Sequence, residues 1–271
     1  MGIVNATPDS FSDGGRFLAP QAALAHARKL IADGADILDV GAESTRPGAD
    51  PVPAEVEIGR LVPLIAALRA ESAIPISVDT MKPEVARAAV AAGATMWNDV
   101  AALRFAPDAL ATAAELGCDV VLMHMQGEPR TMQAEPHYVD VVAEVCAFLA
   151  ERAEASLAAG VARERIWLDP GIGFGKHMTR HNLPLLAHLD RVVALGFPVL
   201  LGASRKAFIG ALDGKAKADE RLGGSIAAAL AGASAGVAAV RVHDVRETVQ
   251  ALAVQAAIAQ AAAAQPGDAP A

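Results

Sequence analysis

The sequence predicts an α/β protein in which eight parallel strands and their helices close into a single (β/α)8 barrel, a TIM barrel. Short apolar runs alternate with longer helical patterns along the chain, and glycine follows many of the helical stretches. Regular strand–helix alternation favours a parallel sheet. Eight such units in about 250 residues favour a closed barrel, whose active site lies at the C-terminal ends of the strands.

The expected strands are short apolar runs rich in β-branched residues. We expect them at Met1–Asn5, Ile37–Val40, Ile74–Asp79, Thr95–Val100, Asp119–His124, Arg165–Asp169, Pro198–Ser204 and Ala238–Val242. An unusual polar residue stands near the end of each run: Asn5, Asp39, Asp79, Asn98, His124, Asp169, Ser204, and Arg241 with His243.

The helices are expected between these runs, where the apolar spacing becomes helical. They are expected at Gln21–Asp33, Ala54–Glu71, Pro83–Ala92, Asp108–Leu116, Val139–Ala159, Asn182–Leu195, Leu222–Ala235 and Val245–Ala263. Glycine just past a helix end is the usual left-handed stop. It occurs here at Gly34, Gly93, Gly117, Gly160, Gly196 and Gly236.

A doubly wound open sheet is the rival interpretation. Such a sheet gathers its ligand groups at one switch point, whereas the polar residues here stand at all eight strand ends. The unbroken alternation predicts one domain over residues 1–263. Residues 264–271 end in Gln-Pro-Gly-Asp-Ala-Pro-Ala, which predicts a disordered tail.

Composition narrows the class of protein. Of the 271 residues, 53% are hydrophobic, which is enough for a large core. The net charge of 23 − 31 = −8 argues against a broad nucleic-acid surface, so an anionic ligand needs a local basic cluster. Cys118 and Cys146 fall in different expected elements, which favours a reduced, cytoplasmic setting. We expect no membrane span, because no apolar run is long enough.

Two acids and an amide at strand ends suggest a ligand with a polar edge. Taken alone, Asp79, Asn98 and Asp169 could each be an ordinary helix cap or turn residue. Together they would line one barrel rim with hydrogen-bond acceptors and one amide. Buried carboxylates need partners. A heterocycle with an amidine-like or guanidine-like edge, such as pterin or guanine, would supply paired hydrogen bonds.

Four basic residues stand where surface charges are uncommon: Arg46, Lys206, Arg241 and His243. Most lysines and arginines are simply solvated, but these lie at strand ends or in a loop stiffened by glycine and proline. Arg241 and His243 are two apart, so on a strand both would point to one face and suit a phosphate or pyrophosphate. Asn5 and Thr45 could add neutral ligands, with a Mg²⁺ ion bridging phosphate oxygens.

Other motifs are excluded or less informative. The run Asp169–Lys176 is neither a P-loop nor a dinucleotide-binding fingerprint, and its glycines could let the backbone lie close to a flat ligand. Phe174 could pack against that ligand or cover the rim. His124 lacks further ligands at metal spacing, so a hydrogen-bonded rim histidine is expected. Ser204 is not in a nucleophile elbow.

Eight motifs together resemble the dihydropteroate synthases. They are MGIVNATPDSFSDGG (1–15), GAESTRPGA (41–49), SVDTMKP (77–83), NDV (98–100), LMHMQG (122–127), DPGIGFGK (169–176), GASRK (202–206) and RVHDV (241–245). The resemblance implies a barrel that condenses 6-hydroxymethyl-7,8-dihydropterin pyrophosphate with p-aminobenzoate, giving 7,8-dihydropteroate and pyrophosphate in folate biosynthesis. It also implies competition by sulfonamides at the p-aminobenzoate position, and a homodimer built on the helices late in the chain.

The resemblance also implies a role for each matching position. The pterin ring would be held by Asp79, Asn98, Asp169 and Lys206. Pyrophosphate would be held by Asn5, Thr45, Arg241 and His243, with Asn5 the ligand of Mg²⁺. The p-aminobenzoate site would be bordered by Phe11, Arg46, Pro47, Phe174 and Ser204. Asp13, in a first mobile loop, would face the developing cation. The catalytic set would be Asp13, Arg46, Lys206, Arg241 and His243.

This reaction needs no enzyme nucleophile, which agrees with the residue pattern. Arg241, His243 and Mg²⁺ would stabilise the charge of the leaving pyrophosphate. Two other functions stay open. One is a pterin-binding methyltransferase acting on a methyl-folate and a corrinoid protein, which has no need of the Ser-Thr-Arg-Pro-Gly and Ser-Arg-Lys segments. The other is a catalytically silent pterin-binding paralogue.

Overall fold

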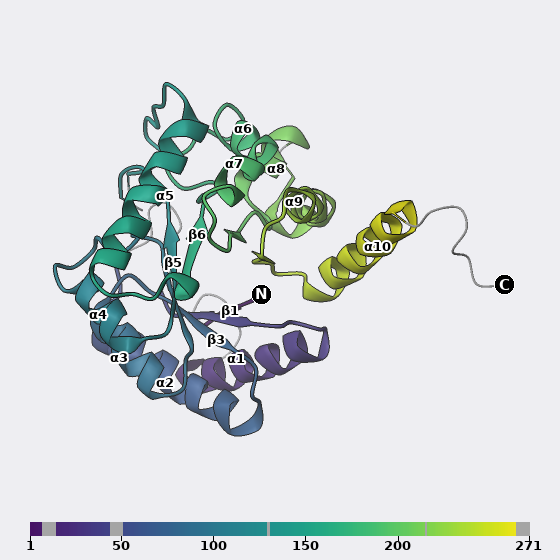
Figure 1. The fold of residues 1–271 in the computed structure, drawn as a ribbon. Coiled ribbons are helices and arrows are strands. Elements are labelled where there is room, and N and C mark those ends of the chain that lie inside the picture. Colours follow the sequence, from purple (N-terminus) through teal and green to yellow (C-terminus); the bar gives the residue numbers. More distant parts are fainter. Residues whose placement is uncertain (7–14, 44–50, 129–130, 215, 264–271) are drawn as a thin grey trace.

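The computed structural model describes residues 1–6, 15–43, 51–128, 131–214 and 216–263, of which 15–20 are described as backbone only. Its eight strands form the inside of a ring and the helices lie outside them (Figure 1). The strands are β1 Gly2–Asn5, β2 Leu38–Gly41, β3 Ile76–Asp79, β4 Met96–Asp99, β5 Asp119–Met123, β6 Ile166–Asp169, β7 Leu200–Leu201 and β8 Ala239–Val240. All of them lie within the ranges expected from the sequence, except that β2 extends one residue further, to Gly41.

The strands close into a barrel. Strands β1 to β6 form one parallel sheet in chain order, and β7 pairs with β8, also in parallel. Isolated parallel bridges join the two sheets at both junctions, Leu168 with Val199 and Gly2 with Val242. The predicted (β/α)8 barrel is therefore confirmed.

The helices follow the strands in sequence. They are α1 Gly15–Ala32, α2 Ala54–Glu71, α3 Pro83–Ala91, α4 Ala109–Leu116, α5 Val141–Ala158, α6 Asn182–Ala187, α7 Leu189–Val193, α8 Ala207–Leu212, α9 Leu222–Ala235 and α10 Val245–Ala263, with 3-10 turns at Arg163–Arg165 and Ala218–Glu220. The expectation of one helix over 182–195 is wrong, because His188 leaves the helical conformation (φ −121°, ψ 36°) and separates α6 from α7. No helix in the described part of the chain is both long and apolar enough to cross a bilayer.

An apolar plug fills one end of the barrel interior. Met1, Met96, Val121 and Leu200 pack together there, with Ile37, Trp167 and Ala239 against them. Strand side chains alternate between the two faces, so the residue two positions further along each strand also faces inward. Those next positions include Asp39, Asn98, Asp169 and Arg241. The sequence thus places polar and charged side chains in the barrel interior next to this apolar cluster.

Candidate active site

Arg241 joins carboxylates from two strands at the open end of the barrel. It follows β8, and its Nε donates to Oδ2 of Asp39 at 2.5 Å while its Nη2 donates to Oδ2 of Asp79 at 2.8 Å. Asp39 is fully buried, and the Nδ2 of Asn98 lies 3.3 Å and 3.4 Å from its two oxygens. This cluster connects strands β2, β3 and β4 with the end of β8.

One carboxylate oxygen of Asp79 is buried and, within the described part of the chain, unpaired. Among the described residues, its Oδ1 is enclosed without a hydrogen-bond partner. Burial raises the pKa of the Asp79 carboxyl to about 7; the nearby Arg241 opposes this rise, and the Asp39 carboxylate adds to it. A buried carboxylate oxygen without a donor is costly, and an N–H group from a ligand would remove that cost.

Asp169 and Lys206 interact electrostatically at the same end of the barrel. Asp169 ends β6, and its Oδ1 accepts from the backbone N–H of Gly171 at 2.7 Å. Burial raises the pKa of Asp169, and the charge of Lys206 opposes that rise. The Lys206 ammonium donates to the carbonyl of Ile172 and stands 4.2 Å from the centre of the Phe174 ring. Burial lowers the pKa of Lys206 to about 8.

The glycine-rich loop after β6 is pressed against the end of β5. Gly171 and Gly175 have positive φ, and a Cβ atom on them would lie 1.9 Å from the carbonyl oxygen of His124 and 2.2 Å from that of Gln126. We expected these glycines to admit a flat ligand. In the structure their closest neighbours are backbone atoms of the protein, so glycine is already required for the loop to pack.

Ser204 and His243 link the ends of β7 and β8. The Oγ of Ser204 lies 3.0 Å from Nδ1 of His243, and the backbone N–H of His243 donates to the same oxygen at 3.2 Å. Strand β8 ends at Val240, but the expected strand continues past Arg241, whose backbone N–H donates to the carbonyl of Leu201 at 2.9 Å, to Val242, which bridges Gly2 in parallel. Arg241 contacts the carboxylates of Asp39 and Asp79, and His243 contacts Ser204 in the loop after β7.

Asn5 ends β1 and is half-buried, in register with Gly41 of β2. The described residues hold no group of three His, Cys, Asp or Glu side chains suited to a metal ion. A Mg²⁺ ion bound through one protein amide would take most of its ligands from phosphate oxygens and water, which is its usual habit in phosphate sites. The other expected site residues lie outside the described part of the chain: Phe11, Asp13, Thr45, Arg46 and Pro47.

Sequence reasoning missed two buried charges at this end of the barrel. It noted Asp39 at a strand edge but gave it no role, although an acid within an apolar strand signals a need for a partner. Lys176 is buried and bonds to His124, whose expected role as a hydrogen-bonded rim residue is confirmed. The sequence offered little indication that Lys176 is buried, because a lysine after a glycine-rich loop is usually solvated.

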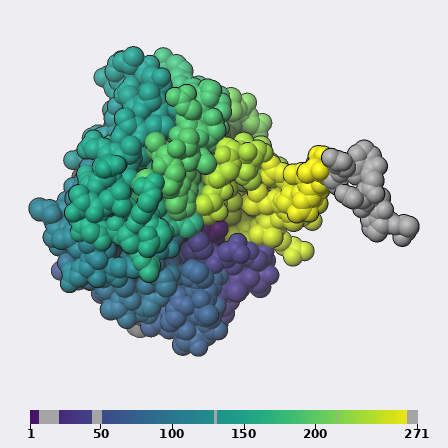
Figure 2. Space-filling view, viewed as in Figure 1, coloured from purple at the N-terminus to yellow at the C-terminus, as the bar shows by residue number. Residues whose placement is uncertain are grey.

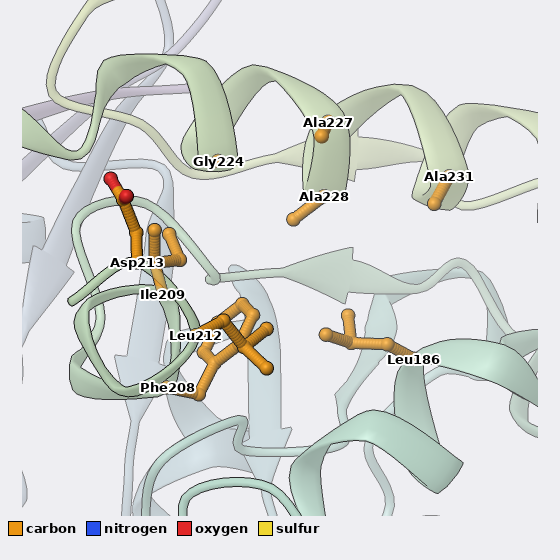
Figure 3. Close-up of a pocket in the computed structure, with 9 residues that line it drawn as sticks. All are labelled: Leu186, Phe208, Ile209, Leu212, Asp213, Gly224, Ala227, Ala228 and Ala231. Carbon is orange, nitrogen blue, oxygen red and sulfur yellow. The ribbon is translucent and has the colours of Figure 1, made fainter.

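An apolar pocket of about 410 Å³ lies elsewhere, in the outer helical layer between α6, α8 and α9 (Figure 3). Leu186, Phe208, Ile209 and Leu212 face it, and Asp213 is the charged residue among those that line it. It offers no positive charge for an anion. The strand ends are therefore the better candidate for a site that binds a polar, anionic molecule.

A barrel whose mouth is lined with buried carboxylates, an amide and basic groups suits a flat, hydrogen-bonding ligand with an anionic tail. The family model described as "Pterin binding enzyme" matches residues 1–243. The dihydropteroate synthase of Neisseria meningitidis serogroup B is 51% identical over 265 residues, covering 95% of this chain and 92% of the relative. The chain therefore belongs to the pterin-binding enzymes and, within them, to the dihydropteroate synthase family.

Solved structures agree in fold. A Xanthomonas albilineans dihydropteroate synthase determined with 4-aminobenzoic acid has a TM-score of 0.90 and 54% identity, covering 98% of this chain and 93% of its own. A second structure from that organism, in complex with 7,8-dihydropteroate, has a TM-score of 0.86 and 51% identity, covering 98% and 94%. Both similarities extend over nearly the whole barrel.

Proposed function

We propose that this protein condenses 6-hydroxymethyl-7,8-dihydropterin pyrophosphate with p-aminobenzoate, giving 7,8-dihydropteroate and pyrophosphate in folate biosynthesis. The observation that carries the proposal is the unpartnered Oδ1 of Asp79 beside Arg241, within the barrel mouth. Family membership supports it, as do the relatives solved with 4-aminobenzoic acid and with 7,8-dihydropteroate.

The pterin ring would be held by the acceptors and donors around the mouth. The carboxylates of Asp79 and Asp169 would accept from the ring's N–H and amino groups, and Asn98 would add an amide. The Lys206 ammonium would donate to the ring's carbonyl. Three of these groups lie on strands β3, β4 and β6, so the rigid barrel fixes their spacing before the ligand arrives, and Lys206 stands in the segment between β7 and α8.

The pyrophosphate would lie toward the basic groups of the last strand. An arginine has several N–H donors, and the bonds to Asp39 and Asp79 use only some of those of Arg241. Arg241 and His243 would thus bind the leaving group together with Asn5 and Thr45. A bound Mg²⁺ ion, held on the protein side by Asn5, would supply further positive charge to the phosphate oxygens.

In the reaction, the bond between the pterin methylene carbon and the pyrophosphate oxygen breaks, and the electron pair leaves with pyrophosphate. The arylamine nitrogen of p-aminobenzoate then forms the new C–N bond and loses a proton. Charge stabilisation around the leaving group lowers this barrier without a protein nucleophile. Asp13 would face the developing cation, and p-aminobenzoate would be bordered by Ser204, Phe174, Phe11, Arg46 and Pro47.

A pyrophosphate-release assay tests this function. We expect release to require the dihydropterin substrate and Mg²⁺, and to be matched by dihydropteroate only when p-aminobenzoate is present. Absence of release under every condition would overturn the proposal and favour a silent paralogue. Methyl transfer from a methyl-folate to a corrinoid protein would support the methyltransferase alternative instead.

We further propose that the protein works as a homodimer formed through helices late in the chain. Figure 2 shows α10 standing out from the body of the molecule. It carries exposed apolar side chains, with Val254 55% and Ile258 65% exposed. Light scattering should give twice the chain mass, and charged substitutions at both positions should reduce it. A single-chain mass for the unaltered protein would contradict the proposal.

A cytoplasmic location is also part of the proposal. Both cysteines, Cys118 and Cys146, carry free thiols, which suits a reducing compartment. Cell fractionation with an antibody against the protein tests this directly. Recovery outside the cytoplasmic fraction would contradict it.

A further inference from the structure

Lys176 is a buried amine held by neutral groups, and burial lowers its pKa well below the usual lysine value. It is 1% exposed. Its Nζ lies 3.0 Å from the carbonyl oxygens of Gly171 and Phe174, 3.2 Å from that of His124, and 2.9 Å from Nδ1 of the same histidine. Burial lowers the pKa of His124 to about 3, so its ring is neutral, and its tautomer sets which partner of the contact with Lys176 donates. One amine therefore joins the start and the middle of the loop after β6 to the end of β5.

Burying the Lys176 amine costs desolvation free energy, which is unexpected for a side chain that only fills space. Burying an ammonium costs free energy unless it is well paired, and a methionine or leucine would fill the same volume without that cost. The Lys176 amine lies within hydrogen-bond distance of two loop carbonyls, those of Gly171 and Phe174, and of the His124 carbonyl at the end of β5, and it has up to three N–H donors for them. The loop conformation therefore depends on this side chain.

The same loop contacts Lys206. The carbonyl of Ile172 accepts from the Lys206 ammonium, and the Phe174 ring stands 4.2 Å from it. Gly173 is pressed against the stem of that lysine, since a Cβ atom there would lie 3.0 Å from Cδ of Lys206. Ile172, Gly173 and Phe174 lie between Gly171 and Lys176, so Lys176 holds the segment from which Lys206 takes its contacts.

We propose that Lys176 is a positioning residue of the pterin subsite: by tying the carbonyls of Gly171 and Phe174 to the end of β5, it sets the place and the solvent exposure of the Lys206 ammonium. This inference rests on the proposed function insofar as Lys206 binds the pterin ring. The effect of Lys176 on the titration of Lys206 can be measured without any substrate.

The first experiment compares Lys176→Met with Lys29→Met, whose lysine is exposed and pairs with Asp33 on the surface. Pulse acetylation across a range of pH, read by mass spectrometry of the Lys206 peptide, gives the titration midpoint of that amine. We expect the midpoint to rise in K176M from about 8, by about one unit, because a released loop admits water to Lys206. The K29M protein should match the parent.

A second variant separates positioning from the loss of a nearby charge. Gly173→Ala keeps Lys176 but adds a Cβ against Lys206 at a residue with φ +84°. It should raise the Lys206 midpoint in the same direction, and the double variant should shift it no further than the larger single shift, since both act through one loop. If the titration midpoint of Lys206 shifted in K176M but not in G173A, the proposal that Lys176 positions Lys206 through the loop would be overturned.

The enzymatic arm measures kinetics with dihydropterin pyrophosphate. We expect K176M to raise KM for this substrate by about tenfold, with a smaller change in kcat, as for loss of one hydrogen-bonded contact. Circular dichroism establishes that the variant is folded, and Lys176→Gln, which keeps N–H donors, replaces it if it is not. An unchanged Lys206 midpoint in a folded variant overturns the inference. An inactive parent protein overturns the proposed function, while the labelling result still decides the role of Lys176.

Discussion

The Nη2 of Arg241 lies 2.8 Å from Oδ2 of Asp79, although the two residues are 162 positions apart in the chain. The guanidinium holds one oxygen of the carboxylate, and the other is buried without a hydrogen-bond partner among the described residues. In the proposed function, Arg241 would both orient an acceptor for the pterin ring and bind the pyrophosphate. Ring recognition and leaving-group stabilisation would then share this residue.

Activity should fall as pH rises through the pKa of Lys206. Burial lowers that pKa to about 8, and deprotonation removes the charge that strengthens the bonds of the amine to the loop and the ring. In Lys206→Arg the guanidinium stays charged, so the alkaline fall in kcat/KM should disappear while the maximum decreases through altered geometry. An identical alkaline fall in K206R would assign the titration to another group.

Substitutions should separate the two substrates. Asp169→Asn removes an acceptor of the proposed pterin subsite and should weaken pterin binding on the order of hundredfold. Arg46→Ala should leave pterin binding nearly unchanged and raise KM for p-aminobenzoate. Calorimetry with the pterin substrate and steady-state kinetics with p-aminobenzoate measure the two effects. Equal loss of pterin binding in both variants would contradict the assignment.

Stability should depend strongly on Lys82. Its ammonium bonds to Glu43 at 2.8 Å and to the fully buried Glu57, which also accepts from Thr80. Lys82→Met leaves two enclosed carboxylates without their cation and should cost about 3–5 kcal/mol of unfolding free energy. Denaturant unfolding measures this, with K29M as a control that stays within about 1 kcal/mol. A loss in K82M no larger than in K29M would contradict the expectation.

Asp99 should make the protein less stable as pH rises. It is fully buried, and both oxygens accept from the backbone, from Ala101 at 2.8 Å and Leu103 at 2.7 Å. Burial nevertheless raises its pKa to about 7. A carboxyl with a raised folded pKa contributes stability below about pH 4 that is lost as pH rises through about 7. Thermal unfolding of Asp99→Asn should show a weaker decline over that interval, and an unchanged decline would refute the assignment.

The fold was predictable because most helices and strands have a recognisable local sequence pattern. Helix α2 spans Ala54–Glu71 as the pattern predicted, and every expected strand is present. The failures are also local in origin. Helix α8 has six residues, too few to show a helical period, and the break at His188 leaves no glycine or proline signal.

The site was only half predictable, for a different reason. Alternation along strands and strand-end positions identify Asp79, Asn98, Asp169 and Arg241 as inward-facing groups. They do not give the partners. Asp39 and Arg241 are separated by 202 positions, and Lys176 reaches His124 across 52. Such pairings arise from barrel closure and loop packing, which a single sequence does not encode as a local pattern.

In the proposed site, the unpartnered oxygen of Asp79 accepts a hydrogen bond from the pterin ring. Calorimetric titration with dihydropterin pyrophosphate, comparing the parent protein with Asp79→Asn, tests it most directly, because the amide retains the size of the side chain and removes the charged acceptor. We predict that the parent binds and that D79N loses affinity on the order of hundredfold, with its circular dichroism unchanged. Equal affinity of the two proteins would contradict the account.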